Sequence, residues 1–440
     1  MSLPFQHRMA HLAPAAAPML NARYECQTLD RQRLAEVLDQ DSGIRGFSED
    51  LQHSHPTLYS GSMVFISAEV AAAIQQAITT LEAVIELPGW RAAALREAPT
   101  IAQHVPRTRG VFMGYDFHID DTGPKLIEIN TNAGGAFLSA ALTRAQQACC
   151  AQMQAHFRPQ AALETIDLRL LQMFRQEWTL ARGEQPLGTV AIVDDAPRDQ
   201  YLWPEFVLAQ RLFQRHGIRA LIADARELHW DGQRLRAGAE PIDLVYNRVT
   251  DFTLAQHPAL REAYAAGAIV LTPAPAHHAL YAHKANLVRL ADRQFLSSIG
   301  ASPSACDLLG GVVPEARRVH ADEAERWWRE RAQWFFKPDS GYGSRAVYRG
   351  DKLTRRVFEE ILQGGYIAQR RVAPGERCVA VDGVLTTLKF DLRAYSYDAQ
   401  VLMLVARMYE GQTTNLRTAG GGFAPVAIVG SSEADTASTD

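Results

Sequence analysis

Three oxygen-bearing side chains, Asp116, Glu128 and Asn130, lie on two short β-like segments that the turn 121–123 separates. Side chains alternate between faces along a strand, and a three-residue loop with glycine at its left-handed position sets Asp116 opposite Glu128. Leu126 is the exception on this otherwise polar face. Carboxylate and amide oxygens from adjacent strands suit Mg²⁺, which takes one or two carboxylates with phosphate oxygens and water. We expect a metal-binding hairpin; the alternative is a half-exposed hairpin whose acids only face water.

A lysine precedes a glycine-rich turn in the last third of the chain, within the segment 335–344, which reads FFKPDSGYGS. Glycines let the backbone turn tightly, so successive N–H groups can converge on an anion. Lys337 adds a point charge suited to a phosphate. The segment is not a Walker A loop, because no Gly-Lys-Ser/Thr opens a helix after it. We expect a phosphate-binding strand and turn, with a plain turn as the alternative.

Charged side chains also gather on a predicted hairpin nearer the C-terminus. Asp391 and Arg393 share one face of a strand, and Arg407 lies on the returning strand. Planar guanidinium groups hold phosphate oxygens in a two-pronged geometry. The alternative is that these arginines are solvated surface residues.

The elements that would position these residues form separate stretches. From Leu187 the chain alternates between β-rich runs and helical patterns, which predicts a parallel α/β sheet. The runs 189–193, 219–222, 242–246 and 268–271 are the expected strands, and 204–216 and 258–265 the expected helices. Two further helices are expected over 66–87, with Ser67 as its N-cap, and over 137–157.

Composition narrows the class of protein. The chain has 440 residues, 47% of them apolar, and a formal net charge of −4. This balance does not favour a nucleic-acid or anionic-membrane partner. Runs of about 18 apolar residues, as a membrane span needs, are not found in the sequence. Five irregularly spaced cysteines and a start without a signal-peptide pattern lead us to expect a cytoplasmic protein with reduced thiols.

Together these motifs resemble the ATP-grasp superfamily. The lysine and glycine turn, the strand 366–369 that ends in Gln369, the hairpin carrying Asp391 and the segment 415–422 look like the corresponding run of bacterial glutathione synthetase. The segment 389–393 also looks like tubulin–tyrosine ligase, and the acidic hairpin resembles the metal hairpin of both families.

The resemblance implies a cofactor, ATP with Mg²⁺, and a role for each matching residue. Metal ligands would be Asp116, Glu128 and Asn130, and the residues implied to hold the γ-phosphate or an acyl phosphate are Arg393, Arg407 and Asn415. Nucleotide contacts would come from Lys284, Lys337, Ser340, Gly341, Gly343, Ser344, Gln369, Arg370, Val372 and Asp391.

The order of the motifs departs from these families, because here the hairpin precedes the phosphate turn by about two hundred residues. The order is similar to that of circularly permuted ATP-grasp proteins. The expected fold is therefore α/β with α+β elements: a circularly permuted ATP-grasp fold with a parallel α/β pre-grasp domain. The expected division is 1–109, a partly helical region; 110–160, the metal-binding hairpin and a helix; 185–284, the pre-grasp domain; 285–430, the nucleotide-binding subdomains; and 431–440, a disordered tail.

The function implied by the resemblance is a ligase that joins a small-molecule carboxylate to an amine, of the amino-acid or peptide class, through an acyl phosphate. Two alternatives stay open: an ATP-dependent phosphotransferase on the same scaffold, and a non-catalytic nucleotide-binding protein. We expect neither nucleic acid nor membrane as partner, and a homodimer is a further expectation.

Overall fold

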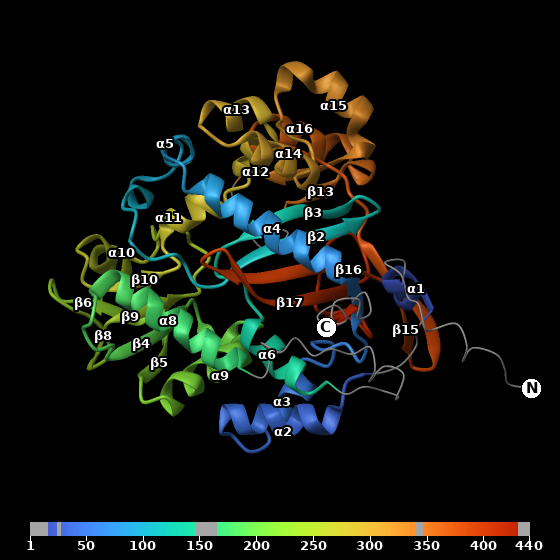
Figure 1. The fold of residues 1–440 in the computed structure, drawn as a ribbon. Coiled ribbons are helices and arrows are strands. Elements are labelled where there is room, and N and C mark those ends of the chain that lie inside the picture. Colours follow the sequence, from blue (N-terminus) through green and yellow to red (C-terminus); the bar gives the residue numbers. More distant parts are fainter. Residues whose placement is uncertain (1–15, 24–27, 147–164, 340–345, 430–440) are drawn as a thin grey trace, which may run out of the picture.

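A seven-stranded sheet lies at the centre of the computed structural model, which describes residues 16–23, 28–146, 165–339 and 346–429 (Figure 1). Its strand order is β1-β18-β17-β16-β2-β3, with β15 paired to β16. Every pair is antiparallel except β1 with β18. The strands are β1 (Val64–Ser67), β2 (Met113–Asp120), β3 (Gly123–Asn130), β15 (Gly375–Val381), β16 (Val384–Tyr397), β17 (Gln400–Tyr409) and β18 (Gly422–Val429). Three distant stretches of the chain thus share one sheet.

The parallel unit predicted after Leu187 is confirmed. Its four strands pair in the order β10-β9-β4-β5, all parallel. The elements are α8 (Ile166–Arg182), β4 (Thr189–Asp194), α9 (Trp203–Arg215), β5 (Arg219–Asp224), β9 (Leu244–Asn247), α10 (Pro258–Ala265) and β10 (Val270–Thr272). A small antiparallel sheet of β6 (Leu228–Trp230), β7 (Leu235–Ala237) and β8 (Glu240–Ile242) is inserted between β5 and β9.

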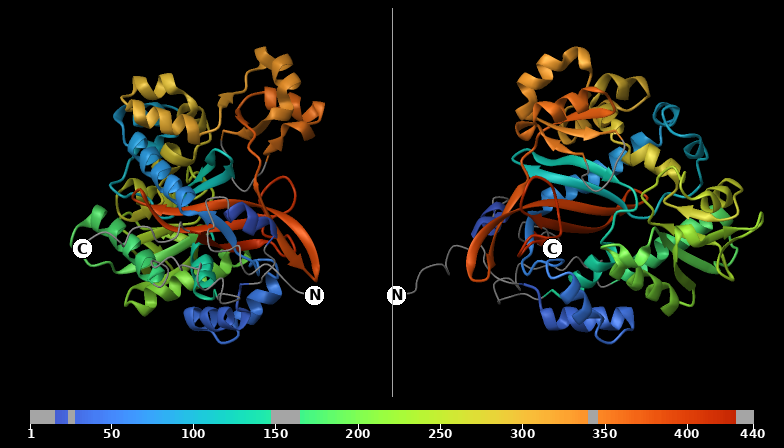
Figure 2. Two further views of the ribbon diagram at one scale, coloured as in Figure 1. Left: turned by 45° about the vertical axis from the view of Figure 1, so that its right-hand side comes forward. Right: turned by 180° about the vertical axis from the view of Figure 1, so that it is seen from behind.

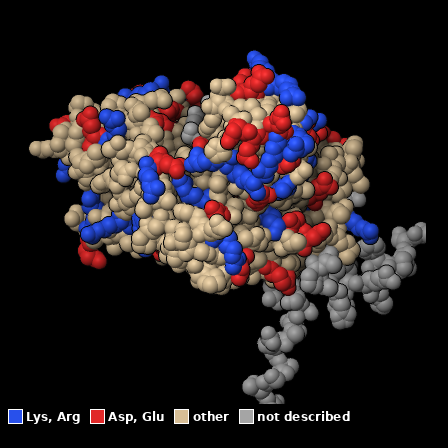
Figure 3. All heavy atoms as spheres, turned by 90° about the horizontal axis from the view of Figure 1, so that it is seen from above, with Lys and Arg blue, Asp and Glu red and all other residues tan. Residues whose placement is uncertain are grey.

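A further four-stranded sheet, in the order β11-β14-β12-β13 and called the third sheet below, lies across the β2–β3 end of the central sheet (Figure 2). Its strands are β11 (Ala316–Arg318), β12 (Trp334–Pro338), β13 (Tyr348–Arg349) and β14 (Tyr366–Arg370). The helices around it are α12 (Ala285–Ala291), α13 (Arg293–Ser298), α14 (Pro303–Val312), α15 (Ala324–Glu330) and α16 (Arg355–Leu362), whereas α11 (Pro275–His277) follows β10. On the face seen from above, acidic and basic side chains are interleaved (Figure 3).

Helices from the first 145 residues lie around the central sheet and beside the parallel unit (Figure 1). They are α1 (Ala16–Arg23), α2 (Arg31–Ser42), α3 (Phe47–Ser54), α4 (Ala68–Ile85), α5 (Pro88–Arg96) and α6 (Ala136–Arg144). Ser67 caps α4 by accepting a hydrogen bond from Val70 N, as predicted. The apolar face of α4 packs on the central sheet. The helix expected over 137–157 ends at Arg144, and residues 147–164 lie outside the described residues.

In the part of the chain that the structure describes, a single helix long and apolar enough to cross a membrane is not found. The pair α4 and α5, bent by 75°, meets the length and composition requirement only when the two helices are taken together.

A buried carboxylate joins four segments beside the central sheet. Glu177 on α8 accepts hydrogen bonds from Arg109 N (2.7 Å), Gly110 N (3.1 Å), Thr272 Oγ1 (2.5 Å) and Tyr397 OH (3.0 Å). Its side chain is fully buried, and burial raises its pKa despite these donors. Glu177 therefore ties α8 to β10, β16 and the segment before β2.

Replacing Glu177 by glutamine should lower the free energy of unfolding by about 2 kcal/mol, because the new amide N–H group faces donors and leaves them unsatisfied. Urea denaturation measures the change. The matched control is Glu184→Gln on an exposed residue, for which we expect a change within about 0.5 kcal/mol. Equal stabilities of the two variants would contradict the assigned role.

Candidate active site

The β2–β3 hairpin pairs Asp116 with Glu128, as predicted, but by a different route. The turn is one residue shorter than expected, since Asp120 pairs directly with Gly123. A bulge then restores the register: Phe117 pairs with Leu126, Asp116 pairs with Glu128, and Ile127 has no partner on β2. The shift also removes the Leu126 anomaly, because this side chain lies in the core and not on the polar face.

The bulge directs backbone acceptors toward the third sheet. Lys337 Nζ donates to Ile127 O (2.8 Å), and Gln369 Nε2 donates to Leu126 O (3.1 Å). Carbonyls of consecutive residues in a regular strand point to opposite edges, so the irregularity lets both accept from one side. Lys337 Nζ also donates to Gln369 Oε1 (2.7 Å). The two side chains thereby cover the open edge of β3.

A second lysine meets the next residue of β3. Lys284, at the N-cap of α12, places Nζ 3.1 Å from Glu128 Oε1. Lys284 and Lys337 are both buried. Burial, together with the charge of Lys284, lowers the pKa of Lys337 to about 8, although Glu128 and Asp116 act in the opposite direction. Two ammonium groups from distant parts of the chain therefore converge on Ile127 and Glu128.

A buried cluster of two carboxylates and two guanidinium groups lies on the neighbouring strands. Asp116 accepts from Arg393 at 2.7 Å through each oxygen, and Arg407 Nη2 lies 2.9 Å from Asp116 Oδ2. Arg407 Nε also donates to Asp391 Oδ1 (2.7 Å). Burial would raise the pKa of Asp116, but Arg393 and Arg407 outweigh it and lower the pKa. The pairs face each other across β2–β16 and β16–β17.

One cavity of about 90 Å³ collects most of the predicted site residues. Those in its wall are Asp116, Glu128, Lys284, Lys337, Gln369, Arg370, Val372, Asp391 and Arg407. A larger groove of about 1060 Å³ lies between α3, α9 and β5. The smaller cavity is the candidate site, because lysines and arginines from separate elements converge on it.

Several predicted residues do not line this cavity. Arg393 and Asn130 contact Asp116, which lines the cavity, but do not line it themselves. Asn130 Nδ2 lies 3.0 Å from Asp116 Oδ2. Asn415 directs its side chain into its own loop, to Glu410 O, Arg417 N and Thr418 Oγ1. Ser340, Gly341, Gly343 and Ser344 lie outside the described residues.

The cavity also contains residues that the sequence analysis missed: His118, Ile127, Phe335, Val347, Tyr409, Gln412, Thr413 and Thr414. His118 was within reach of prediction, since it follows Asp116 by two residues on the same strand. Its Nδ1 bonds Val372 O (2.9 Å), and burial lowers its pKa. Thr414 Oγ1 contacts Asp391, but nothing in the sequence around it signals that contact.

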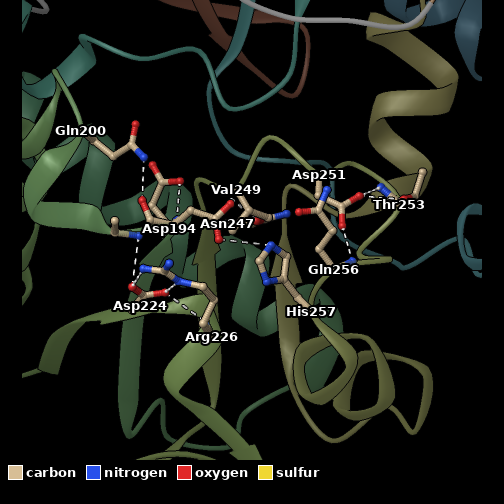
Figure 4. A network of polar contacts seen from close by, with 12 residues as sticks. Asp194, Gln200, Asp224, Arg226, Asn247, Val249, Asp251, Thr253, Gln256 and His257 are labelled. Atoms are coloured by element: carbon tan, nitrogen blue, oxygen red, sulfur yellow. Dashed lines mark hydrogen bonds and ion pairs between the residues drawn. The ribbon is translucent and has the colours of Figure 1, made fainter.

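A polar network lies at the carboxyl ends of β4 and β9 (Figure 4). Burial raises the pKa of Asp194 to about 7, and His257 Nε2 lies 3.3 Å from Asp195 Oδ1. Arg248, next to this network, donates through Nη1 to Asn132 O (2.5 Å), two residues beyond Asn130. The parallel sheet is thus joined directly to the end of the hairpin.

The oxygen donors of the hairpin fit a hard divalent cation such as Mg²⁺. Glu128 offers a carboxylate, and Asn130 offers an amide oxygen, since its Nδ2 already donates to Asp116. Asp116 differs, because both of its oxygens accept from guanidinium groups. Within the described ranges no cluster of three or more His, Cys, Asp or Glu side chains is placed to hold a metal, so a cation here depends on the amide and on ligand oxygens.

Comparison with known proteins gives structural matches only. No family model and no curated protein matches the sequence. A glutathione synthetase-like effector (GSS30) from Globodera pallida, solved in the apo form, matches with a TM-score of 0.54 and 12% identity, over 91% of this chain and 98% of that one. A protein from Methylobacillus flagellatus KT, assigned as a γ-glutamylcysteine synthetase, gives 0.41 and 9%, over 79% and 85%.

A third structure, D-alanyl-alanine synthetase A from Vibrio cholerae O1 biovar eltor, gives a TM-score of 0.27 and 11% identity, over 52% of this chain and 76% of that one. The similarity of fold rests on the effector, whose match covers nearly the whole of both chains. The chain has an ATP-grasp-like fold, the fold of glutathione synthetase-like proteins.

Proposed function

We propose that this chain is an ATP- and Mg²⁺-dependent ligase that joins a carboxylate to an amine through an acyl phosphate. One observation carries the proposal: Lys284 and Lys337 converge on consecutive residues of β3, beside the two arginines that bracket Asp116. Lys284, Lys337 and Arg407 line one cavity, where ammonium and guanidinium groups can contact phosphate oxygens. The order of hairpin and lysine strand along the chain supports the circularly permuted arrangement.

The proposed reaction has two steps. An oxygen of the substrate carboxylate attacks the γ-phosphorus of ATP, the bond to the bridging oxygen breaks, and ADP leaves. The amine nitrogen then attacks the acyl carbon, phosphate leaves, and the proton of the amine passes to solvent or phosphate. Phosphoryl transfer of this kind depends mostly on positioning and charge neutralisation, so a side-chain nucleophile is not required.

The residues of the chain divide this work. Lys337 and Lys284 bind phosphate oxygens, and Arg407 stabilises the charge on the group being transferred, while Arg393 holds Asp116 beside it. Gln369, Arg370 and Val372 line the cavity, and in this proposal they would contact the nucleotide base. When bound, Mg²⁺ would supply charge neutralisation between phosphate oxygens, held by Glu128 and Asn130 with Asp116 close by.

Nucleotide binding has to break contacts that now span the cavity. The Lys337–Gln369 and Lys284–Glu128 contacts would be exchanged for contacts to phosphate, base and metal. The cavity of about 90 Å³ is smaller than the 300–1,000 Å³ typical of pockets for drug-sized ligands. We therefore expect the third sheet to shift relative to the central sheet when ATP enters.

The test is ADP release measured against panels of amino acids and small peptides, with a carboxylate and an amine supplied separately and together. The ligase predicts release that depends on the carboxylate and a product that requires the amine. A stable phosphorylated product without amine dependence would indicate a phosphotransferase instead. ADP release that no carboxylate increases would overturn the proposal.

Replacing Glu128 by alanine should raise the Mg²⁺ concentration needed for half-maximal ADP release about tenfold, which corresponds to roughly 1.4 kcal/mol. Asn130 and the phosphate oxygens would remain as ligands, so binding would be weakened and not lost. A Mg²⁺ titration of the wild type and the variant measures the shift. The control is Glu184→Ala, which should leave the Mg²⁺ requirement unchanged. An unchanged Mg²⁺ requirement in Glu128→Ala would show that Glu128 is not a metal ligand.

A further inference from the structure

Asp339 joins the two lysines of the site through its main chain. It follows the strand that carries Lys337, and its N–H donates to Gly365 O (2.7 Å). Its carbonyl oxygen accepts from Lys284 N (3.1 Å). The spacing between the lysine at the end of β12 and the lysine at the start of α12 therefore depends on the position of this one residue.

The side chain of Asp339 is anchored away from the lysines. Its Oδ2 lies 3.0 Å from Arg318 Nη1 on β11. Its Oδ1 is buried and has no hydrogen-bond partner among the described residues. A buried carboxylate oxygen without a donor is costly, so the guanidinium of Arg318 is the principal compensation for this charge.

Arg318 continues the network to the N-terminal part of the chain. Its Nη2 lies 2.5 Å from Glu97 Oε2, and Arg289 Nη2 on α12 lies 2.7 Å from Glu97 Oε1. Partial burial acts to raise the pKa of Glu97, but Arg289 and Arg318 outweigh it and lower the pKa. Glu97, at the C-cap of α5, thus connects α12, whose N-cap is Lys284, with β11, whose Arg318 pairs with Asp339.

We infer that Asp339 is a positioning residue that sets the separation of Lys284 and Lys337 for a triphosphate, and that Arg318 and Glu97 fix its position. The inference rests on the proposed function, since it assumes that both lysines bind the phosphates of ATP. It gives the end of α5 a part in nucleotide binding. The main-chain hydrogen bonds of Asp339 remain when its side chain is replaced. Mutation can therefore test the pair between its carboxylate and Arg318.

The experiment measures the dissociation constants of a fluorescent ATP analogue with Mg²⁺, and of adenosine, for Asp339→Asn, Arg318→Gln and the double variant. We expect each single variant to bind the ATP analogue about fivefold more weakly, as suits a partly exposed ion pair. The double variant should lose no more than Arg318→Gln alone, because both changes remove the pair between Asp339 and Arg318. Adenosine affinity should not change, because adenosine has no phosphate.

The matched control is Arg317→Gln. Arg317 is the neighbour of Arg318 on β11, and its guanidinium pairs with Glu315 at 2.7 Å on the exposed side. We expect Arg317→Gln to bind the ATP analogue as tightly as the wild type does.

The outcomes separate the two claims. If the wild-type chain does not bind the ATP analogue, the proposed function fails and the inference fails with it. If the wild type binds but Asp339→Asn and Arg318→Gln bind as tightly as Arg317→Gln, only the inference is overturned. If the variants bind the ATP analogue and adenosine more weakly by the same factor, Asp339 and Arg318 have only a structural role. That outcome also overturns the inference.

Discussion

Lys337→Met should lower the rate of ADP release about 100-fold while leaving the chain folded. The charge-assisted hydrogen bond from Lys337 to a phosphate would be worth about 1.5–3 kcal/mol, and the larger value corresponds to roughly 100-fold. The fold should tolerate the change, because Lys337 is buried and its depressed pKa shows that burial disfavours the charge. We expect a melting temperature equal to or above that of the wild type.

The control for Lys337→Met is Lys352→Met, which removes an exposed lysine from the same part of the chain. It should leave ADP release unchanged. If Lys337→Met retained the wild-type rate, Lys337 would not contact the transferred phosphate. If the variant lost both its activity and its fold, the main role of Lys337 would be structural, through its contact with β3.

The pH dependence of nucleotide binding follows from the same lysine. The pKa of Lys337 is about 8 in the folded chain and 10.5 in its ordinary environment, so the ammonium group is lost as the pH rises through 8. Affinity for ATP should therefore fall above pH 8. Between about pH 8 and 10.5 the unfolded chain binds more protons than the folded one, so the contribution of Lys337 to stability rises with pH. In Lys337→Met both dependences should be lost.

The hairpin shows how far sequence periodicity predicts this site. Alternation and a turn signal are local, and they predicted the pair Asp116 and Glu128, which is found only because a bulge compensates for a turn one residue shorter than predicted. The bulge at Ile127 was not predictable, because its carbonyl partner, Lys337, lies 210 residues further along the chain. Local patterns fix which residues can face each other, whereas distant partners decide where a strand departs from regularity.

The surroundings of Asp116 show the same limit. From the sequence, Asp116 is one of three acidic or amide oxygen donors on a hairpin, which suggested a metal ligand. In the fold, β16 lies beside β2 and brings Arg393 opposite Asp116. Pairing between strands so far apart in the chain leaves no signal in a single sequence, so the guanidinium contacts could not be foreseen.

The fold was predicted best where it is built from neighbouring segments. The parallel sheet of β4, β5, β9 and β10 follows from alternating strands and helices, and it is confirmed. The central sheet was not foreseen as one unit, since β1 pairs with β18, more than 350 residues away. A short run such as 64–67, in which three residues are apolar, can form a buried strand or part of a helix, and only its partner decides between them.

Arg407→Met should lower the free energy of unfolding by about 3–5 kcal/mol, the usual loss when one partner of a buried ion pair is removed. Arg407 lies between Asp116 and Asp391, and the side chains of both acids are only 5% exposed. Burial opposes the charge of Arg407, but Asp116 and Asp391 outweigh it and raise its pKa. Without the guanidinium, Asp391 would lose its only arginine contact among the described residues. Urea denaturation with linear extrapolation measures the loss.

Two further variants and a pH series make the Arg407 result specific. Arg356→Met removes an arginine that is 86% exposed, and should change stability by less than about 0.5 kcal/mol. Arg407→Met combined with Asp391→Asn should recover part of the loss, because one unpaired charge is removed with its partner. In Arg407→Met alone the deficit should shrink as the pH falls below the ordinary range of carboxyl groups, since the lowered pKa of Asp116 means that the wild type then loses the stability that its pairing with Arg407 contributes. A deficit below about 1 kcal/mol at neutral pH would mean that water reaches Asp116 and Asp391, and the cluster would then not be the desolvated, charge-matched site that phosphoryl transfer requires.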